Sequence, residues 1–433
     1  MQTAISRFLA QSIEAQDPER RDKLINTSLA LLSGAGVLAI ILISIVVWKS
    51  PLIFHGIPKN LLGEFRRAAL LMGIGACLML PLSTFTGVLI GLHRNEFPAI
   101  AIGTSRLLGA LAVLTMVRFT HSLVTLAGCI VAMNLLGGFV QMLVTQRLLP
   151  TLRIALRNTH PLIMREMVRY CLGLSVWSFT MLLVSGLDVT IVGHYRFSSV
   201  GSYSIASVLI TFFAGLNQSV ISALMTPVAA LQVRDDWVQI RHLVLRATTL
   251  NTEANILLTC MLVALGPCIL QAWVGQAYAN QALPILYVLA IAQAVRLMAN
   301  PYATMLAASG NQRDAILPAL IEACSNLALS ITGAIFFGAA GVAWGTLIGA
   351  IIGVLALLAY TVPKVKRYVF ISSRDLLLEG VGYPILVTSP LLLCISIGVL
   401  FHYHLIWLSL FGLAFSVAVW LVKSKKATQS LIN

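Results

Sequence analysis

Ionisable side chains inside long apolar stretches are the residues of this sequence with the clearest chemical potential. Arg106, Arg296 and Glu322 fall near the middle of such stretches, and Asp188 falls towards the end of another. A charge is costly to hold in hydrocarbon, so each should face water, a ligand or an opposite charge. An arginine can pair with two phosphate oxygens through its planar fork. A carboxylate shielded from water gains affinity for a proton.

Each of these four residues also has a purely structural interpretation. Arg106 or Arg296 could form an ion pair with Glu322 that only joins two helices, and Asp188 could be solvated or cap a neighbouring helix. The functional interpretation places Arg106 and Arg296 in a cavity, where they bind an anionic ligand. In the same interpretation, Glu322 and Asp188 bind a coupling proton or sodium ion. Both interpretations stay open at this point.

Amide side chains and prolines in the apolar stretches form a second set of candidates. Asn300 and Asn326 are predicted to contact a polar ligand, although intramembrane amides join helices about as often. Pro81 and Pro301 each remove a backbone hydrogen bond and permit a bend. We predict that they are hinges, and a static kink is the alternative.

Motifs of soluble catalysis are missing from the sequence. It contains no GxxxxGK[ST] phosphate loop, HExxH motif or nucleophile elbow, and its connections are too short for an extramembrane enzyme. The 7 cysteines lack metal-ligand spacing. The glycine-rich segment 338–341 is interpreted as a close helix turn. We therefore predict a protein that is not an enzyme and has no cofactor beyond a coupling ion.

The candidates are carried by a chain that is too apolar for a soluble fold. Of its 433 residues, 58% are hydrophobic and only 10% are charged. Uncharged runs of about 20 residues are long enough to cross a bilayer and predict an all-α polytopic membrane protein of about twelve helices. The predicted spans are 25–48, 68–92, 97–117, 121–145, 170–193, 200–225, 247–271, 281–305, 314–337, 338–361, 380–401 and 405–422.

Basic residues orient these spans. The net charge is +14, but the 29 Lys and Arg residues lie in short connections between apolar runs, which argues against a nucleic-acid partner. Most of them fall in alternate connections, as the positive-inside rule requires if both termini are cytoplasmic. The surrounding partners of such spans are membrane lipids.

An internal repeat relates the two halves of the sequence. The segment around Asp17 and Pro18 resembles the segment around Asp236 and Trp237, at an offset of about 220 residues. Pro81 falls at a similar offset from Pro301. Repeats of this kind are typical of transporters whose two bundles alternate about a central site. We predict two pseudo-symmetric bundles.

The repeat also sets the expected domain boundaries. Two helices precede the polar segment in the second half and none precede it in the first, so the first half is expected to lack a helical hairpin. We expect a chain shortened from about fourteen helices, and a genuine twelve-helix protein is the alternative. The expected parts are 1–24, a cytoplasmic amphipathic segment; 25–169, an incomplete N-terminal bundle; 170–361, a six-helix bundle; and 362–433, two further helices and a basic tail.

Several motifs resemble those of polysaccharide (O-antigen type) flippases, whose superfamily also contains multidrug extruders and lipid II flippases. The matching segments are GLDVTIVGHY (186–195), VGSYSIA (200–206), MTPVAAL (225–231), AWVGQAY (272–278) and LAASGN (306–311). The resemblance is best from about residue 170 to 360 and departs at the N-terminus, where the first helical hairpin of the family is missing.

The resemblance implies a MATE-like flippase fold and a substrate. Together with the short inner loops and the absence of organelle targeting, it also implies the inner membrane of a bacterium. The implied substrate is an undecaprenyl-diphosphate-linked oligosaccharide for cell-surface polysaccharide such as lipopolysaccharide, with a polysaccharide polymerase as a further partner. Arg106 and Arg296 would then hold the diphosphate. The alternatives are a multidrug or cation antiporter of the same superfamily, a membrane-embedded glycosyltransferase and a non-functional fragment. Acidic groups in the cavity would favour the antiporter, and a large outer loop would favour the glycosyltransferase.

Overall fold

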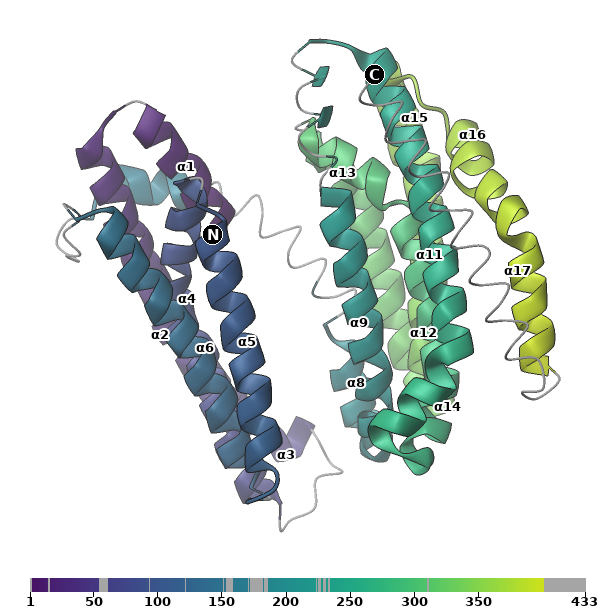
Figure 1. Cartoon of the computed structure of the whole chain (residues 1–433), viewed down its shortest axis with the longest axis horizontal. Helices are drawn as coiled ribbons and strands as arrows, with labels where there is room; N and C mark the ends of the chain where they lie inside the picture. The colour runs from purple at the N-terminus through teal and green to yellow at the C-terminus, as the bar shows by residue number, and fades with distance from the viewer. Residues whose placement is uncertain are drawn as a thin grey trace. The chain divides into compact units, whose positions relative to one another are not determined.

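The computed structural model consists of two compact helical units, Met1–Val176 and Trp177–Asn433 (Figure 1). No strand occurs among the residues that the structure describes. These are residues 2–14, 16–53, 61–92, 94–120, 122–150, 152, 159–169, 171, 182, 186–222, 224, 227–228, 231–232, 234–309 and 311–400.

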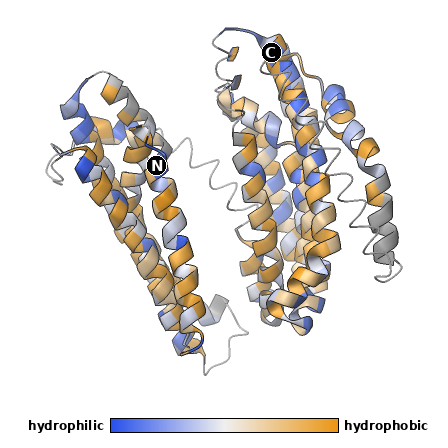
Figure 2. Cartoon of the chain, viewed as in Figure 1, coloured by the Kyte–Doolittle hydropathy of each residue, from blue (hydrophilic) through white to orange (hydrophobic). Residues whose placement is uncertain are grey.

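Within these described ranges, eight helices are long and apolar enough to cross a membrane. They confirm the predicted all-α, multi-pass membrane architecture. Figure 2 shows that hydrophobic residues dominate the lengths of these helices. The spans are Pro18–Trp48, Leu62–Gly91, Glu96–Met116, Leu123–Leu148, Phe197–Gln218, Trp237–Val274, Gln276–Ala308 and Arg313–Lys366. The predicted span 405–422 and most of 170–193 lie outside the described residues.

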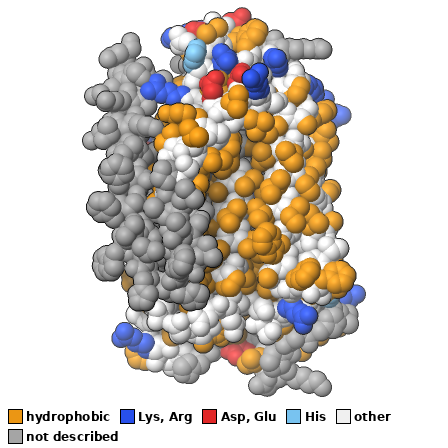
Figure 3. All heavy atoms as spheres, turned by 90° about the vertical axis from the view of Figure 1, so that its right-hand side faces the viewer, with side chains coloured by type: hydrophobic (Ala, Val, Ile, Leu, Met, Phe, Trp, Pro, Cys, Tyr) orange, Lys and Arg blue, Asp and Glu red, His pale blue; other side chains and the backbone are white. Residues whose placement is uncertain are grey.

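The surface agrees with a membrane environment. Figure 3 shows hydrophobic side chains spread over the middle of one face, with Lys and Arg gathered beyond both ends of this band. Exposed large residues such as Phe336, Phe337 and Trp344 are 75%, 77% and 53% accessible. Lipid tails would cover such residues in a bilayer.

In the first unit, helix α4 (Leu62–Gly91) contacts α1 (Gln2–Glu14), α2 (Pro18–Trp48) and α6 (Leu123–Leu148), and α6 also contacts α5 (Glu96–Met116). A short helix, α3 (Ser50–Ile53), follows α2. Ile5 and Leu9 of α1 press against Gly87 and Gly91 of α4, where an added Cβ would approach their side chains to 2.9 Å. Helix α2 begins at Pro18, within the predicted segment 1–24, and the cytoplasmic place of this segment stays a prediction.

The two units begin an equivalent long helix in the same way. Asp17 caps α2 by accepting a hydrogen bond from Arg20 N at 2.9 Å, and Asp236 caps α11 (Trp237–Val274) by accepting one from Gln239 N at 3.0 Å. The residue before each cap, Gln16 or Asp235, has a positive φ of 52° or 56°. The backbone of the two turns therefore repeats at the offset found in the sequence.

The second unit surrounds a core formed by α8 (Asp188–Tyr195), α9 (Val200–Ser222), α11, α12 (Gln276–Met298) and α14 (Ile316–Ala356). The short helix η2 (Phe197–Ser199) joins α8 to α9, and α13 (Asn300–Ala308) and η3 (Gln312–Ala315) join α12 to α14. The π-helix η4 (Leu357–Thr361), α15 (Val362–Val369), α16 (Ser373–Asp375), the π-helix η5 (Leu376–Gly382) and α17 (Tyr383–Leu400) follow.

Helix α14 is a tight hairpin of two arms. Gly338 turns the chain with φ 64° and ψ −141°, a conformation open mainly to glycine, and the backbones of Gly333 and Gly341 then meet directly. The turn falls at the predicted boundary between spans 314–337 and 338–361, which confirms the interpretation of the 338–341 segment. Small residues at the contact let the two arms approach closely.

Candidate functional site

Arg106 lies at the midpoint of α5, which runs from Glu96 to Met116. Its side chain is exposed on the surface of the first unit, whereas Ser105 and Gly109 are buried. Among the described residues it has no hydrogen bond or ion pair. A guanidinium at this depth is too costly to leave in hydrocarbon. The helix therefore presents an arginine that needs water or a ligand.

Arg296 and Glu322 form an ion pair between α12 and α14. The Arg296 Nε donates to Glu322 Oε1 at 2.6 Å, and the Nη1 donates to Gln293 Oε1 at 3.2 Å. The two charged side chains are 19% and 12% exposed. The Nη2 is buried without a partner among the described residues. The structural alternative foreseen for Arg296 is therefore present, and one nitrogen of the fork is left over.

Asp188 is buried at the start of α8, with 7% of its surface exposed. Its Oδ2 accepts hydrogen bonds from the hydroxyls of Tyr203 on α9 at 3.2 Å and Thr346 on α14 at 3.0 Å. The solvated interpretation of Asp188 is wrong. Ion coupling by this carboxylate stays a prediction.

Asn300 belongs to a cluster of amide side chains. Its Nδ2 donates to Asn217 Oδ1 at 3.2 Å and to Gln218 Oε1 at 3.1 Å. The Nδ2 of Asn217 in turn donates to Asn251 Oδ1 at 2.6 Å and Asn255 Oδ1 at 3.1 Å. Sequence reasoning missed Asn251 and Asn255. Their spacing of four, which puts both on one face of α11, is the signal that could have found them.

Pro301 lies in the first turn of α13, directly after the break that ends α12 at Met298. Proline has no N–H to donate to the carbonyl four residues earlier, which belongs to Leu297. The Nδ2 of Asn251 supplies the missing donor at 2.7 Å. The predicted hinge thus coincides with a real interruption of the helix, held by the amide cluster.

Pro81 lies inside α4. It likewise has no N–H to donate to the carbonyl four residues earlier, which belongs to Cys77. Gly36 of α2 packs against the Cys77 carbonyl, and an added Cβ would lie 3.0 Å from its oxygen. Here the helix continues through the proline. The two prolines therefore lie in different local structures, and the hinge role of both stays a prediction.

Asn326 lies within the α14 hairpin and is fully buried, with 0% exposure. Its Oδ1 accepts a hydrogen bond from Ser330 at 2.8 Å, and its backbone packs on Gly349. No ligand can reach the side chain in this conformation. Substrate binding by Asn326 stays a prediction for which the geometry offers no support.

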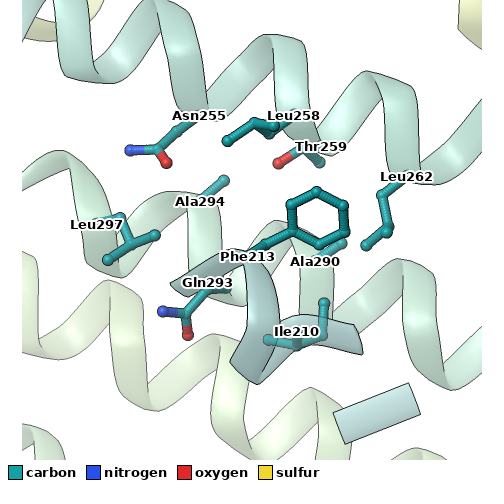
Figure 4. A pocket seen from close by; sticks show the side chains of 10 residues that line it. All are labelled: Ile210, Phe213, Asn255, Leu258, Thr259, Leu262, Ala290, Gln293, Ala294 and Leu297. Carbon is teal, nitrogen blue, oxygen red and sulfur yellow. The ribbon is translucent and has the colours of Figure 1, made fainter. Parts of the chain in front are cut away.

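A small cavity lies beside the amide cluster and the ion pair, between α9, α11 and α12 (Figure 4). The figure shows the amides of Asn255 and Gln293 towards one end, and the ring of Phe213 among side chains that are apolar except for the hydroxyl of Thr259. The cavity volume is about 30 Å³. A space this small holds water molecules and excludes a sugar ring.

No family model and no curated protein matches the sequence. Solved structures do match. The inward-facing conformation of a multidrug resistance MATE family transporter of the MOP superfamily superposes with a TM-score of 0.74 at 14% identity, covering 85% of this chain and 86% of that chain. The inward closed conformation of the lipid II flippase MurJ superposes with a TM-score of 0.71 at 15% identity, covering 100% and 90%. A MATE structure in complex with MaL6 gives 0.62 at 14% identity, covering 86% and 85%.

The chain therefore has the fold shared by MATE transporters and MurJ. The MATE-like fold predicted from the resemblance is confirmed. These identities are too low to assign a substrate, and the O-antigen specificity stays a prediction.

Proposed function

We propose that this protein is a flippase that carries a lipid-linked oligosaccharide, joined to its lipid by a diphosphate, across the bacterial inner membrane by alternating access. Both termini are cytoplasmic in this proposal, and a polysaccharide polymerase uses the product on the other side. MurJ, a neighbour whose match covers 100% of this chain, is described as a lipid II flippase. It supports a lipid-linked substrate.

The observation that carries the proposal is that Arg106 is exposed at the midpoint of α5. An exposed arginine at mid-span that has no partner among the described residues needs a water-filled path or an anion to offset the cost of its charge. Its planar fork suits the oxygens of a diphosphate. A cationic drug would be repelled by the same group.

The charged residues of the second unit also favour an anionic substrate. Its Glu322 is neutralised by Arg296, and Asp188 is buried behind Tyr203 and Thr346. These carboxylates therefore do not offer a free negative surface to a bulky cationic drug. Asp188 instead suits a coupling proton or sodium ion, because it is shielded from water and lies beside the hydroxyl oxygens of Tyr203 and Thr346. The break at Pro301 supplies the bending point for alternating access.

The test measures lipid-linked glycans by mass spectrometry in cells lacking the gene. We expect a complete glycan unit to accumulate on its polyprenyl diphosphate, and the wild-type chain to clear it. Arg106→Ala should clear it at least about tenfold more slowly, because a charge-assisted pair contributes about 1.5–3 kcal/mol. Arg106→Lys should fall between the two, since it keeps the charge and loses the fork.

Arg118→Ala is the matched control, because Arg118 follows the end of the same helix and is also exposed. It should behave as wild type. If no glycan accumulates and sensitivity to cationic drugs rises, the protein is a multidrug or cation antiporter instead; the MATE neighbour is described as a multidrug resistance transporter.

A further inference from the structure

The cavity between α9, α11 and α12 contains a polar group without a partner. Asn255 lines the cavity and is only 3% exposed. Its Nδ2 has no hydrogen-bond partner among the described residues. A buried amide nitrogen left without an acceptor costs about 1–3 kcal/mol. The cavity is the place where that acceptor can sit.

The break at Pro301 determines which side-chain atom of Asn255 accepts a hydrogen bond within the amide cluster and which is left as a donor. The Leu297 carbonyl can only accept, so Asn251 must give it its Nδ2. The Asn251 Oδ1 is then an acceptor and takes one hydrogen of Asn217 Nδ2, whose other hydrogen goes to Asn255 Oδ1. Asn255 is left with its NH₂ group as the free donor. One proline thus sets the polarity of the whole chain of amides.

Gln293 presents the same kind of group to the cavity. Its Oε1 accepts from Arg296 Nη1 at 3.2 Å, which leaves the Nε2 as its other hydrogen-bonding group. Gln293 and Asn255 line the cavity from α12 and α11 (Figure 4). Two NH₂ donors require an acceptor oxygen and disfavour a cation. The volume of about 30 Å³ has room for a few water molecules, since each needs roughly 10–15 Å³.

We propose that this cavity is a binding site for ordered water, held by Asn255 and Gln293. The water connects the amide chain at the Pro301 break with Gln293, and through Gln293 with the Arg296 and Glu322 pair. The site is independent of the transported substrate. It makes the broken joint between α12 and α13 and the buried ion pair parts of one hydrogen-bonded network.

Radiolytic hydroxyl-radical labelling read by mass spectrometry tests the site in the purified full-length protein without substrate. Radicals formed from bound water oxidise the side chains next to it. Phe213 lines the cavity and should be labelled in the wild type. Phe85, 1% exposed in the first unit and without a polar side-chain atom, is the internal control and should stay unlabelled.

Asn255→Leu removes the donor at nearly constant volume and should lower the labelling of Phe213 at least fivefold relative to wild type, roughly the loss of one bound water. Asn300→Ala, which alters the amide cluster away from the cavity lining, should leave the labelling unchanged. An unlabelled Phe213 in the wild type, or equal labelling in Asn255→Leu, would overturn the proposal. If Asn255→Leu does not fold, Gln293→Leu tests the same cavity from α12 with the same expected loss.

Discussion

Gly349 lies directly against Asn326 across the α14 hairpin: a Cβ atom on residue 349 would fall 2.8 Å from the Cα and the Cβ of Asn326. The contact belongs to a repeated pattern. Gly345 meets the backbone of Ser330, and Gly353 meets Glu322 at 2.7 Å from a built Cβ. Glycines at every fourth position of one arm thus receive larger residues of the other. The pattern fixes the position of Glu322, the partner of Arg296.

Gly349→Ala should destabilise the protein by about 1–3 kcal/mol, because the added methyl group overlaps the backbone of Asn326. Thermal unfolding in detergent measures the effect. Gly215→Ala on α9 is the matched control, since nothing lies within 4 Å of its added Cβ. The control should be neutral or slightly stabilising, because alanine favours a helix. Equal effects of the two substitutions would show that the hairpin contact is not tight.

Pro301→Ala should slow clearance of the lipid-linked glycan while leaving the melting temperature the same or higher. The new N–H can donate to Leu297 O, compete with Asn251 and make α12 and α13 more continuous. Pro284→Ala is the control, because Pro284 lies inside α12 away from the break. If both variants slow clearance equally, the joint at Pro301 has no special role.

Replacing only one residue of the Arg296 and Glu322 ion pair should destabilise the protein. Glu322→Leu or Arg296→Met alone should lower the free energy of unfolding by about 3 kcal/mol, because each leaves a buried charge unpaired. The double variant should recover much of that loss. Denaturation of all four proteins in detergent gives the coupling energy.

Arg94 and Glu96 provide the comparison for that cycle. Their side chains are 58% and 49% exposed, so their coupling should stay below about 1 kcal/mol. If the losses at Arg296 and Glu322 simply add, the two residues do not act as a pair.

Asp375 should make stability depend on acid pH. The Ser372 backbone N–H, which donates to its carboxylate at 3.1 Å, holds the pKa of Asp375 below its ordinary value, helped by the Ser372 hydroxyl and Arg241. A depressed pKa in the folded state contributes stability above the unfolded pKa of about 3.9, and this is lost as the pH falls through the folded pKa. Asp375→Asn should remove that part of the pH dependence.

Melting temperatures between pH 7 and pH 3 measure the effect for wild type and Asp375→Asn. The two curves should differ most at neutral pH and converge in acid. Curves that stay parallel would show that the cap at Ser372 does not depend on the charge of Asp375.

Sequence patterns predicted part of the candidate site. Arg296 and Glu322 were recognised as possible partners because a charge within an apolar run needs compensation. Asn300 was recognised and Asn255 was missed, since the role of Asn255 depends on a carbonyl freed by Pro301 on another helix. The choice between ligand and structural partner for Arg296 could not be made from the sequence, because it depends on which faces of α12 and α14 meet.

The sequence by itself determined the membrane class, the repeated turn at Asp17 and Asp236 and the break at Gly338. Hydrophobic length, helix capping and backbone φ are set by neighbouring residues, so they can be recognised along the chain. Only the tertiary structure decided that Asp188 meets Tyr203 and Thr346, that Asn326 is closed against Gly349, and that Asn255 faces a cavity. Those contacts join residues far apart in the chain, and their partners follow from how the helices pack.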